Sequence, residues 1–186
     1  MSDRPSRKRF PSSDALDAAY EFARQRARAD GYVDPVAIGG YALQLYGSPR
    51  LTLDLDVIVE GEPSLVVPLG ELSFGGIRVE APNGVPVDFI VRNDAYRDLY
   101  REAAQHAAEV EDVRAVQPHY LVALKLASAV HRGRQRRDLD DIAFLVKTDQ
   151  VDLTRARDII ERHLGPYAAQ RFDELVREIQ LLESEE

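Results

Sequence analysis

The sequence has no cysteine and no tryptophan among its 186 residues. Without cysteine the chain has no disulfide, no thiolate metal site and no cysteine nucleophile. It also has no run approaching the roughly 20 apolar residues that a membrane-spanning helix needs. The basic start of the chain is not followed by an apolar segment, as a secretory signal would be. We therefore expect a cytoplasmic protein with no membrane partner.

Basic residues are too few for a broad nucleic-acid footprint. Lysine and arginine number 24 against 32 aspartates and glutamates, which gives a net charge of -8. Extensive electrostatic binding to nucleic acid needs the opposite balance. A local basic stretch at residues 131–137 holds four arginines, and is either a contact for an acceptor's phosphates or a solvated loop. The acidic balance by itself also fits an acidic adaptor unrelated to nucleotides.

The length fits one domain, or one domain with a helical appendage. We expect a disordered tail at residues 1–11, a core over residues 12–117 and a helical region over residues 118–186. Because strand-like runs and helix-like runs alternate in the core, the predicted fold is α/β. It consists of a small mixed, twisted sheet with flanking helices, and a C-terminal helical bundle that packs on the core and closes one side of a cleft.

Periodicity and turn residues place the elements along the chain. The expected strands are 35–38, 51–59, 76–80, 85–91 and 113–116. The expected helices are 12–30, 41–46, 94–104, 118–130, 137–146, 152–164 and 166–182.

The strand expected over residues 51–59 carries two acids. Side chains alternate between the faces of a strand, so Asp54 and Asp56 share one face, while Leu53 and Leu55 lie on the other. Aspartate is depleted in strands, and two carboxylates on one face repel each other. A divalent cation between them removes the repulsion. Mg²⁺, which prefers hard oxygen ligands, is the natural candidate.

A third acid, Asp88, lies in the strand expected over residues 85–91. On a neighbouring strand it could bind the same ions and accept the proton of an attacking hydroxyl. This requires the strands that contain Asp54 and Asp88 to be neighbours. The alternatives for Asp88 are an exposed strand position or a partner for Arg78.

Two glycines, Gly39 and Gly40, lie at an expected strand-to-helix turn before the acids. Glycine lets a backbone approach a ligand closely, and a helix N-terminus offers N–H groups to phosphate. Arg50 and Thr52 lie between these glycines and Asp54. The order of glycines, paired acids and a later third acid is more specific than any part alone.

Residues 38–40 followed by 50–57 resemble the signature of the nucleotidyltransferase (DNA polymerase beta-like) superfamily. Residues 120–127 and 136–142 are similar to the AbiEii-type branch, which includes toxins of bacterial toxin–antitoxin pairs. The resemblance implies an enzyme that transfers a nucleoside monophosphate from an NTP, such as ATP, and releases pyrophosphate. The acceptor would be a hydroxyl or phosphate of a tRNA end, a small molecule or a protein, and an antitoxin protein is a possible partner.

The resemblance also implies roles for individual residues. Asp54, Asp56 and Asp88 would bind Mg²⁺ or Mn²⁺, with Asp88 as third ligand or base. Gly39, Gly40, Arg50, Thr52 and Lys125 would hold the NTP, with Lys125 steadying the triphosphate.

Some features leave alternatives open. The family pattern often has serine where this chain has Gly40, which offers no hydroxyl to phosphate, and the chain is short. The competing function is therefore a catalytically inactive binding or regulatory module of the same fold. Lys125 either meets phosphate or extends along apolar surface to solvent. We expect Asp141 to hold Lys125 or Arg137 in place.

Overall fold

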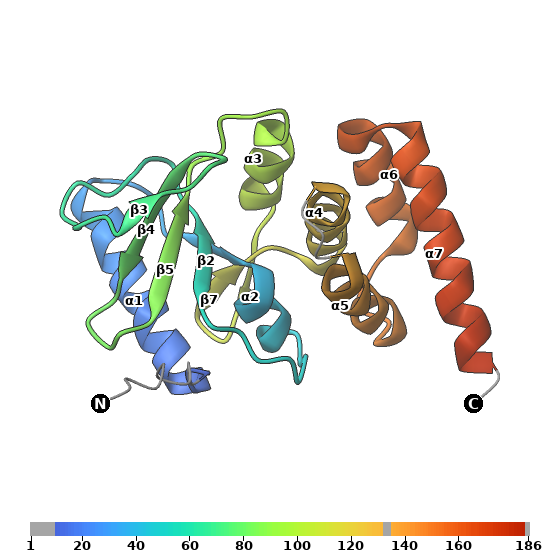
Figure 1. Cartoon of the computed structure of the whole chain (residues 1–186), viewed down its shortest axis with the longest axis horizontal. Helices are drawn as coiled ribbons and strands as arrows, with labels where there is room; N and C mark the ends of the chain where they lie inside the picture. Colours follow the sequence, from blue (N-terminus) through green and yellow to red (C-terminus); the bar gives the residue numbers. More distant parts are fainter. Residues whose placement is uncertain (1–9, 132–134, 185–186) are drawn as a thin grey trace, which may run out of the picture. The chain divides into compact units, whose positions relative to one another are not determined.

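The computed structural model describes residues 10–131 and 135–184 (Figure 1). Contacts within the chain divide it into two compact units, residues 1–91 and 92–186. The domain boundary expected after residue 117 falls inside the second unit, between a strand and a helix. Residues 1–9, which are most of the tail expected to be disordered, lie outside the described residues. The same holds for Arg132 and Arg134 of the basic stretch.

The first unit is a mixed sheet with two helices. Its elements are α1 (Ser13–Ala29), β1 (Val36–Ile38), α2 (Gly39–Leu45), β2 (Leu55–Ile58), β3 (Gly70–Glu71), β4 (Gly76–Glu80) and β5 (Pro86–Ile90). Within the unit the strands follow the order β3-β4-β5-β2-β1. β2 and β5 are parallel, whereas the other neighbouring pairs are antiparallel. The predicted α/β class and mixed sheet are confirmed.

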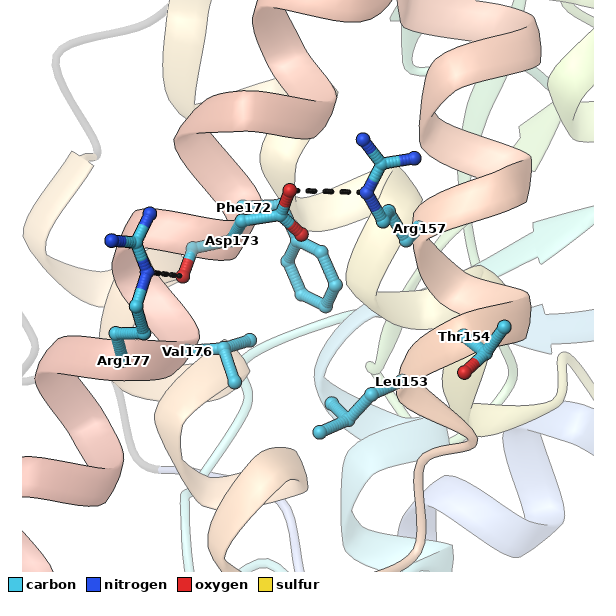
Figure 2. Close-up of a pocket in the computed structure, with 7 residues that line it drawn as sticks. All are labelled: Leu153, Thr154, Arg157, Phe172, Asp173, Val176 and Arg177. Carbon is cyan, nitrogen blue, oxygen red and sulfur yellow. Dashed lines mark hydrogen bonds and ion pairs between the residues drawn. The ribbon is translucent and has the colours of Figure 1, made fainter.

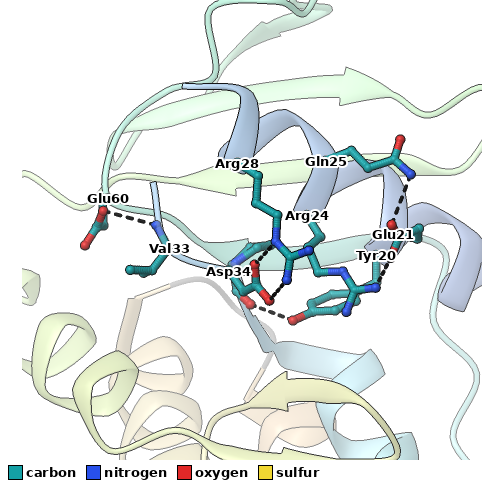
Figure 3. Close-up of polar contacts among 9 residues, drawn as sticks. Tyr20, Glu21, Arg24, Gln25, Arg28, Val33, Asp34 and Glu60 are labelled. Carbon is teal, nitrogen blue, oxygen red and sulfur yellow. Dashed lines mark hydrogen bonds and ion pairs between the residues drawn. The ribbon is translucent and has the colours of Figure 1, made fainter. Parts of the chain in front are cut away.

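Helix α1 begins where the sequence predicts, because the Ser12 hydroxyl accepts the backbone N–H three residues later at 3.2 Å. Its buried stripe packs against β2 and β5. Polar contacts then fix the connection from α1 to β1 (Figure 3). Arg28 donates from Nε and Nη2 to both oxygens of Asp34, at 2.6 and 2.7 Å. The Tyr20 hydroxyl donates to the carbonyl of Pro35 at 2.8 Å.

Strand β2 is shorter than the strand predicted over residues 51–59. Its ladder partners, β1 and β5, reach no further back than Leu55. Residues 53 and 54 form a bend, and the Leu53 side chain is 37% exposed. The prediction that Leu53 and Leu55 share one face of a strand is therefore wrong, since residue 53 lies outside β2 and side-chain alternation holds only where the backbone lies in the ladder. Leu55 and Val57 are fully buried.

Strands β4 and β5 form the hairpin that Asn83-Gly84 predicts. Gly84 has φ +80°, and its N–H donates to the carbonyl of Ala81 at 2.8 Å. The turn fixes the register of the hairpin and places Arg78 opposite Asp88.

The second unit is mainly helical. It contains α3 (Arg97–Gln105), β6 (Ala108–Val110), β7 (Val113–Ala115), α4 (Pro118–His131), α5 (Gln135–Lys147), α6 (Leu153–Leu164) and α7 (Pro166–Ser184). β6 and β7 pair as an antiparallel hairpin, of which the sequence predicted only β7. The helices expected in this region are all present, and α6 and α7 lie side by side (Figure 1). None of the helices in the described part of the chain is long and apolar enough to cross a membrane.

Caps and an apolar core hold the helices of the second unit together. The Asp152 carboxylate accepts the backbone N–H of Arg155 at 2.9 Å and caps α6. Gly165, at φ +90°, ends α6 before Pro166 begins α7. The core side chains of α4, α5, α6 and α7 include Leu121, Val122, Ile142, Leu145, Ile159, Ile160 and Phe172.

Candidate metal centre

Three carboxylates converge on one place in the first unit. β2 and β5 are parallel neighbours, and their register puts Asp56 beside Asp88. Asp54 precedes β2 at the bend. One ligating oxygen from each of Asp54, Asp56 and Asp88 lies within 4.8 Å of the other two. The predicted adjacency of the two acid-bearing strands is confirmed.

Thr52 helps to place Asp54, which lies outside the ladder. The Thr52 side chain is buried, and its hydroxyl lies 3.2 Å from the Asp54 carbonyl and 3.3 Å from Oδ1 of the Asp54 carboxylate. Such a local hydrogen bond substitutes for the missing strand partner. In this structure Thr52 therefore supports a carboxylate, a role that the sequence did not indicate.

Arg78 contacts two of the three carboxylates. Its Nε donates to Oδ1 of Asp88 at 2.6 Å, and its Nη2 donates to Oδ2 of Asp88 at 2.8 Å. The same Nη2 donates to Oδ2 of Asp54 at 3.1 Å. The hydrogen bonds with Asp88 raise the pKa of the Arg78 guanidinium, and burial partly opposes this effect. The negative charges of Asp88, Asp54 and Asp56 raise the pKa further.

The pairing of Arg78 with Asp88, an alternative in the sequence analysis, is thus present together with the carboxylate cluster. The hairpin was the signal that could have found it, but only with the observed loop. The loop of residues 82–84 is centred on residue 83 and places residues 78 and 88 opposite each other, whereas a two-residue Asn83-Gly84 turn would have paired residue 79 with residue 88.

The glycine turn lies directly against the cluster. Gly39 has φ +65°, and a Cβ at this position would collide with Oδ2 of Asp56. A Cβ at Gly40 would lie 2.6 Å from both Cβ and Oγ1 of Thr52. Both glycines are therefore required by close approach of other groups. Arg50 lies nearby in the chain, and its carbonyl accepts a hydrogen bond from Nε2 of Gln44 at 2.7 Å.

Lys125 belongs to α4 of the second unit, where it is enclosed by acids. Its Nζ lies 3.1 Å from Oδ1 of Asp138 and 2.7 Å from Oδ2 of Asp141. The expected contact with Asp141 is confirmed. The lysine side chain is 11% exposed, so the alternative in which it extends to solvent is wrong. Its role at a triphosphate stays a prediction.

The residues of the centre suit a hard divalent cation. Three carboxylates carry more negative charge than the Arg78 guanidinium alone balances, and all three offer oxygen ligands. Mg²⁺ and Mn²⁺ prefer such ligands. Because Gly39 has no side chain, the Asp56 carboxylate can lie directly against the turn. The arrangement fits the metal that the sequence predicts.

A separate pocket lies between α6 and α7 (Figure 2). It has a volume of about 310 Å³ and an apolar lining that includes Leu153 and Phe172. Across it, Nε of Arg157 donates to Oδ2 of Asp173 at 3.0 Å. None of the predicted site residues lines this pocket.

Comparison with known proteins supports the fold. No protein-family model matches the chain, and no curated protein matches its sequence. A solved structure of a protein from H. pylori, provisionally assigned as a nucleotidyltransferase, is similar with a TM-score of 0.51 and 18% sequence identity. The match covers 95% of this chain and 99% of that chain. At this identity the likeness shows a nucleotidyltransferase-like fold.

Proposed function

We propose that this chain is a metal-dependent nucleotidyltransferase, which transfers a nucleoside monophosphate from an NTP to a hydroxyl or phosphate of an acceptor. The observation that carries the proposal is the convergence of Asp54, Asp56 and Asp88 against the Gly39 turn. The similar fold of the H. pylori protein supports it. Neighbouring carboxylates repel each other unless positive charge lies beside them, and Arg78 supplies only one positive charge for the three acids.

In the proposed reaction, an acceptor oxygen forms a bond to the α-phosphorus of the NTP. The bond between that phosphorus and the bridging oxygen to the β-phosphate breaks, and pyrophosphate leaves. Asp54, Asp56 and Asp88 would hold Mg²⁺ or Mn²⁺, which when bound neutralises charge on the phosphates and orients the reacting oxygens. We assign to Asp88 a second role, acceptance of the acceptor's proton.

The remaining assigned residues would position the NTP. We assign the backbone of the Gly39-Gly40 turn to phosphate, since neither residue carries a side chain. Arg50 and Thr52 connect this turn to the carboxylates, and Thr52 orients Asp54 through its hydroxyl. Lys125 is assigned to the triphosphate.

The acceptor is proposed from the sequence resemblance alone. It is a tRNA end, a small molecule or a protein side chain. A role as the toxin of a toxin–antitoxin pair, with an antitoxin protein as partner, follows from the same resemblance. The cytoplasm is the proposed compartment because a chain without cysteine gains nothing from an oxidising environment.

One observation favours a second candidate function, a catalytically inactive binding or regulatory module. Both oxygens of Asp88 are engaged by Arg78, as in a structural ion pair. A module of this kind would bind metal and nucleotide without releasing pyrophosphate. Pyrophosphate release with any NTP and acceptor would remove this alternative.

The test is a thermal-unfolding panel with each NTP, with and without Mg²⁺. We compare the wild type with Asp54→Asn/Asp56→Asn and with a control, Asp98→Asn/Asp158→Asn, which makes the same change at two exposed positions. We expect metal-dependent stabilisation by at least one NTP in the wild type and the control, and its loss in the first variant. Equal stabilisation of all three proteins would disprove the proposed site.

A further inference from the structure

Arg78, Asp88 and Asp56 form a row across three adjacent strands. Arg78 on β4 is paired in register with Asp88 on β5, and Asp88 is paired in register with Asp56 on β2. Side chains at paired positions of neighbouring strands point to the same face of a sheet. The guanidinium is thus built into the same face as the carboxylates.

The contacts of Arg78 go beyond those of a simple ion pair. Its fork engages both oxygens of Asp88 and one oxygen of Asp54. The Asp88 side chain is only 6% exposed, whereas that of Arg78 is 42% exposed. A carboxylate that is so deeply buried needs a compensating positive group. The Arg78 side chain, unlike the Asp88 carboxylate, is thus partly open to solvent.

We infer that Arg78 is the resident counter-cation of the carboxylate centre, and that it competes with the metal ion for Asp54 and Asp88. The inference rests on the proposed function, because it concerns the metal of the same site. Arg78 then sets the affinity of the centre for the metal and holds the metal-free carboxylates in place. It is a positioning residue in this reading.

Electrostatics gives the direction of the effect. A divalent ion ligated by Asp54 and Asp88 would lie within a few ångströms of a guanidinium that is bonded to the same two carboxylates. Like charges at this separation repel strongly where solvent is partly excluded. Metal binding therefore weakens the contacts of Arg78, starting with the longest, the 3.1 Å contact with Asp54.

The experiment measures Mn²⁺ binding without nucleotide, by calorimetry at fixed ionic strength, on Arg78→Gln and the wild type. The matched control is Arg28→Gln. Arg28 forms a bidentate pair with Asp34 of nearly the same geometry, in the same unit but with no contact to the three acids (Figure 3). Both variants remove one positive charge and one bidentate pair. Thermal unfolding of each protein, with and without Mn²⁺, is the second readout.

We expect Arg78→Gln to bind Mn²⁺ about tenfold or more tightly than the wild type, because one repelling charge beside a divalent ion is removed. Its metal-free form should unfold at a lower temperature, and Mn²⁺ should restore most of that loss. Arg28→Gln should bind Mn²⁺ as the wild type does. If Arg78→Gln does not fold without metal, Arg78→Lys, which keeps the charge and loses the fork, should bind Mn²⁺ within a few-fold of the wild type.

The outcomes separate this inference from the proposed function. If the wild type binds Mn²⁺ and Arg78→Gln binds it equally well or more weakly, the inference is overturned and the proposed metal site is not. An affinity of Arg78→Lys far above that of the wild type also overturns it, since the charge would then be irrelevant. Absence of Mn²⁺ binding in the wild type and in both Arg78 variants overturns both.

Discussion

Gly39 and Asp56 approach each other so closely that no side chain fits between them. A Cβ on Gly39 would collide with Oδ2 of Asp56, one of the three candidate metal ligands. The turn that starts α2 and the carboxylate centre are therefore parts of one packed arrangement. A change at either position should be felt at the other.

This contact makes Gly39→Ala a specific test. The matched control is Gly31→Ala, where φ is also positive, at +78°, but where a Cβ would meet nothing within 4 Å. We expect Gly31→Ala to lower the free energy of unfolding by about 1–2 kcal/mol, from backbone strain alone. Gly39→Ala should lower it further and should also weaken Mn²⁺ binding, because Asp56 must move. If Gly39→Ala and Gly31→Ala lower the free energy of unfolding in urea equally, and both bind Mn²⁺ as the wild type does, the close contact between Gly39 and Asp56 is contradicted.

The absence of serine at position 40 has a steric reason that can be tested with Thr52. Gly40→Ala should lower the free energy of unfolding by about 1–3 kcal/mol, because the added Cβ overlaps the Thr52 side chain. In a Thr52→Gly background the same change should cost less, with a coupling above about 0.5 kcal/mol. Urea unfolding of the four proteins measures the coupling. Additive effects would show that Thr52 is not the obstacle.

The lysine of α4 should be more important for stability than either of its acids. Lys125→Met leaves Asp138 and Asp141, both at least 94% buried by side chain, without their ammonium partner. We expect a loss of about 3–5 kcal/mol in the free energy of unfolding. Asp138→Asn should cost less, since a one-to-one pair of Lys125 with Asp141 remains and Oδ2 of Asp138 has no hydrogen-bond partner. Urea unfolding that shows the reverse order would contradict this account.

His119 should make the protein less stable in acid. Burial, with the nearby charge of Arg155, lowers its pKa from 6.5 to about 4, and its Nε2 has no hydrogen-bond partner. The unfolded chain then takes up a proton below pH 6.5, whereas the folded protein resists protonation down to about pH 4. The contribution of neutral His119 to the free energy of unfolding is therefore complete above pH 6.5. It decreases by as much as about 3 kcal/mol as the pH falls from 6.5 to about 4.

The measurement is the free energy of unfolding of the wild type and His119→Gln between pH 7.5 and about 4.5, over the range in which a histidine with an ordinary pKa titrates. We expect the wild type to lose more stability than the variant as the pH falls. Parallel curves for the two proteins would show that His119 does not control the acid sensitivity.

Much of the candidate site could be predicted from local pattern. The spacing of Asp54 and Asp56, the Asn83-Gly84 turn and the glycines at 39 and 40 are all signals between residues close in sequence. Such signals are strong because they are set by backbone geometry and short-range hydrogen bonds. The helix ends at Ser12 and Gly165 follow from the same physics.

Other features depended on pairing between distant segments. The parallel alignment of β2 with β5, which puts Asp88 beside Asp56, was an expectation that no local pattern could establish. The same pairing limits β2 to four residues and exposes Leu53. β6 was missed because a three-residue strand exists only through its partner β7.

The sequence by itself identified the candidate site residues, three aspartates and two glycines, and most of the helices and strands that hold them. Only the tertiary structure decided that Arg78 engages two of these aspartates at once, that Gly39 presses against Asp56 and that Lys125 is enclosed by two acids. The reason is physical. Composition and periodicity fix what each segment tends to form, whereas the distance between two charges is fixed only when strand order and register bring their segments together.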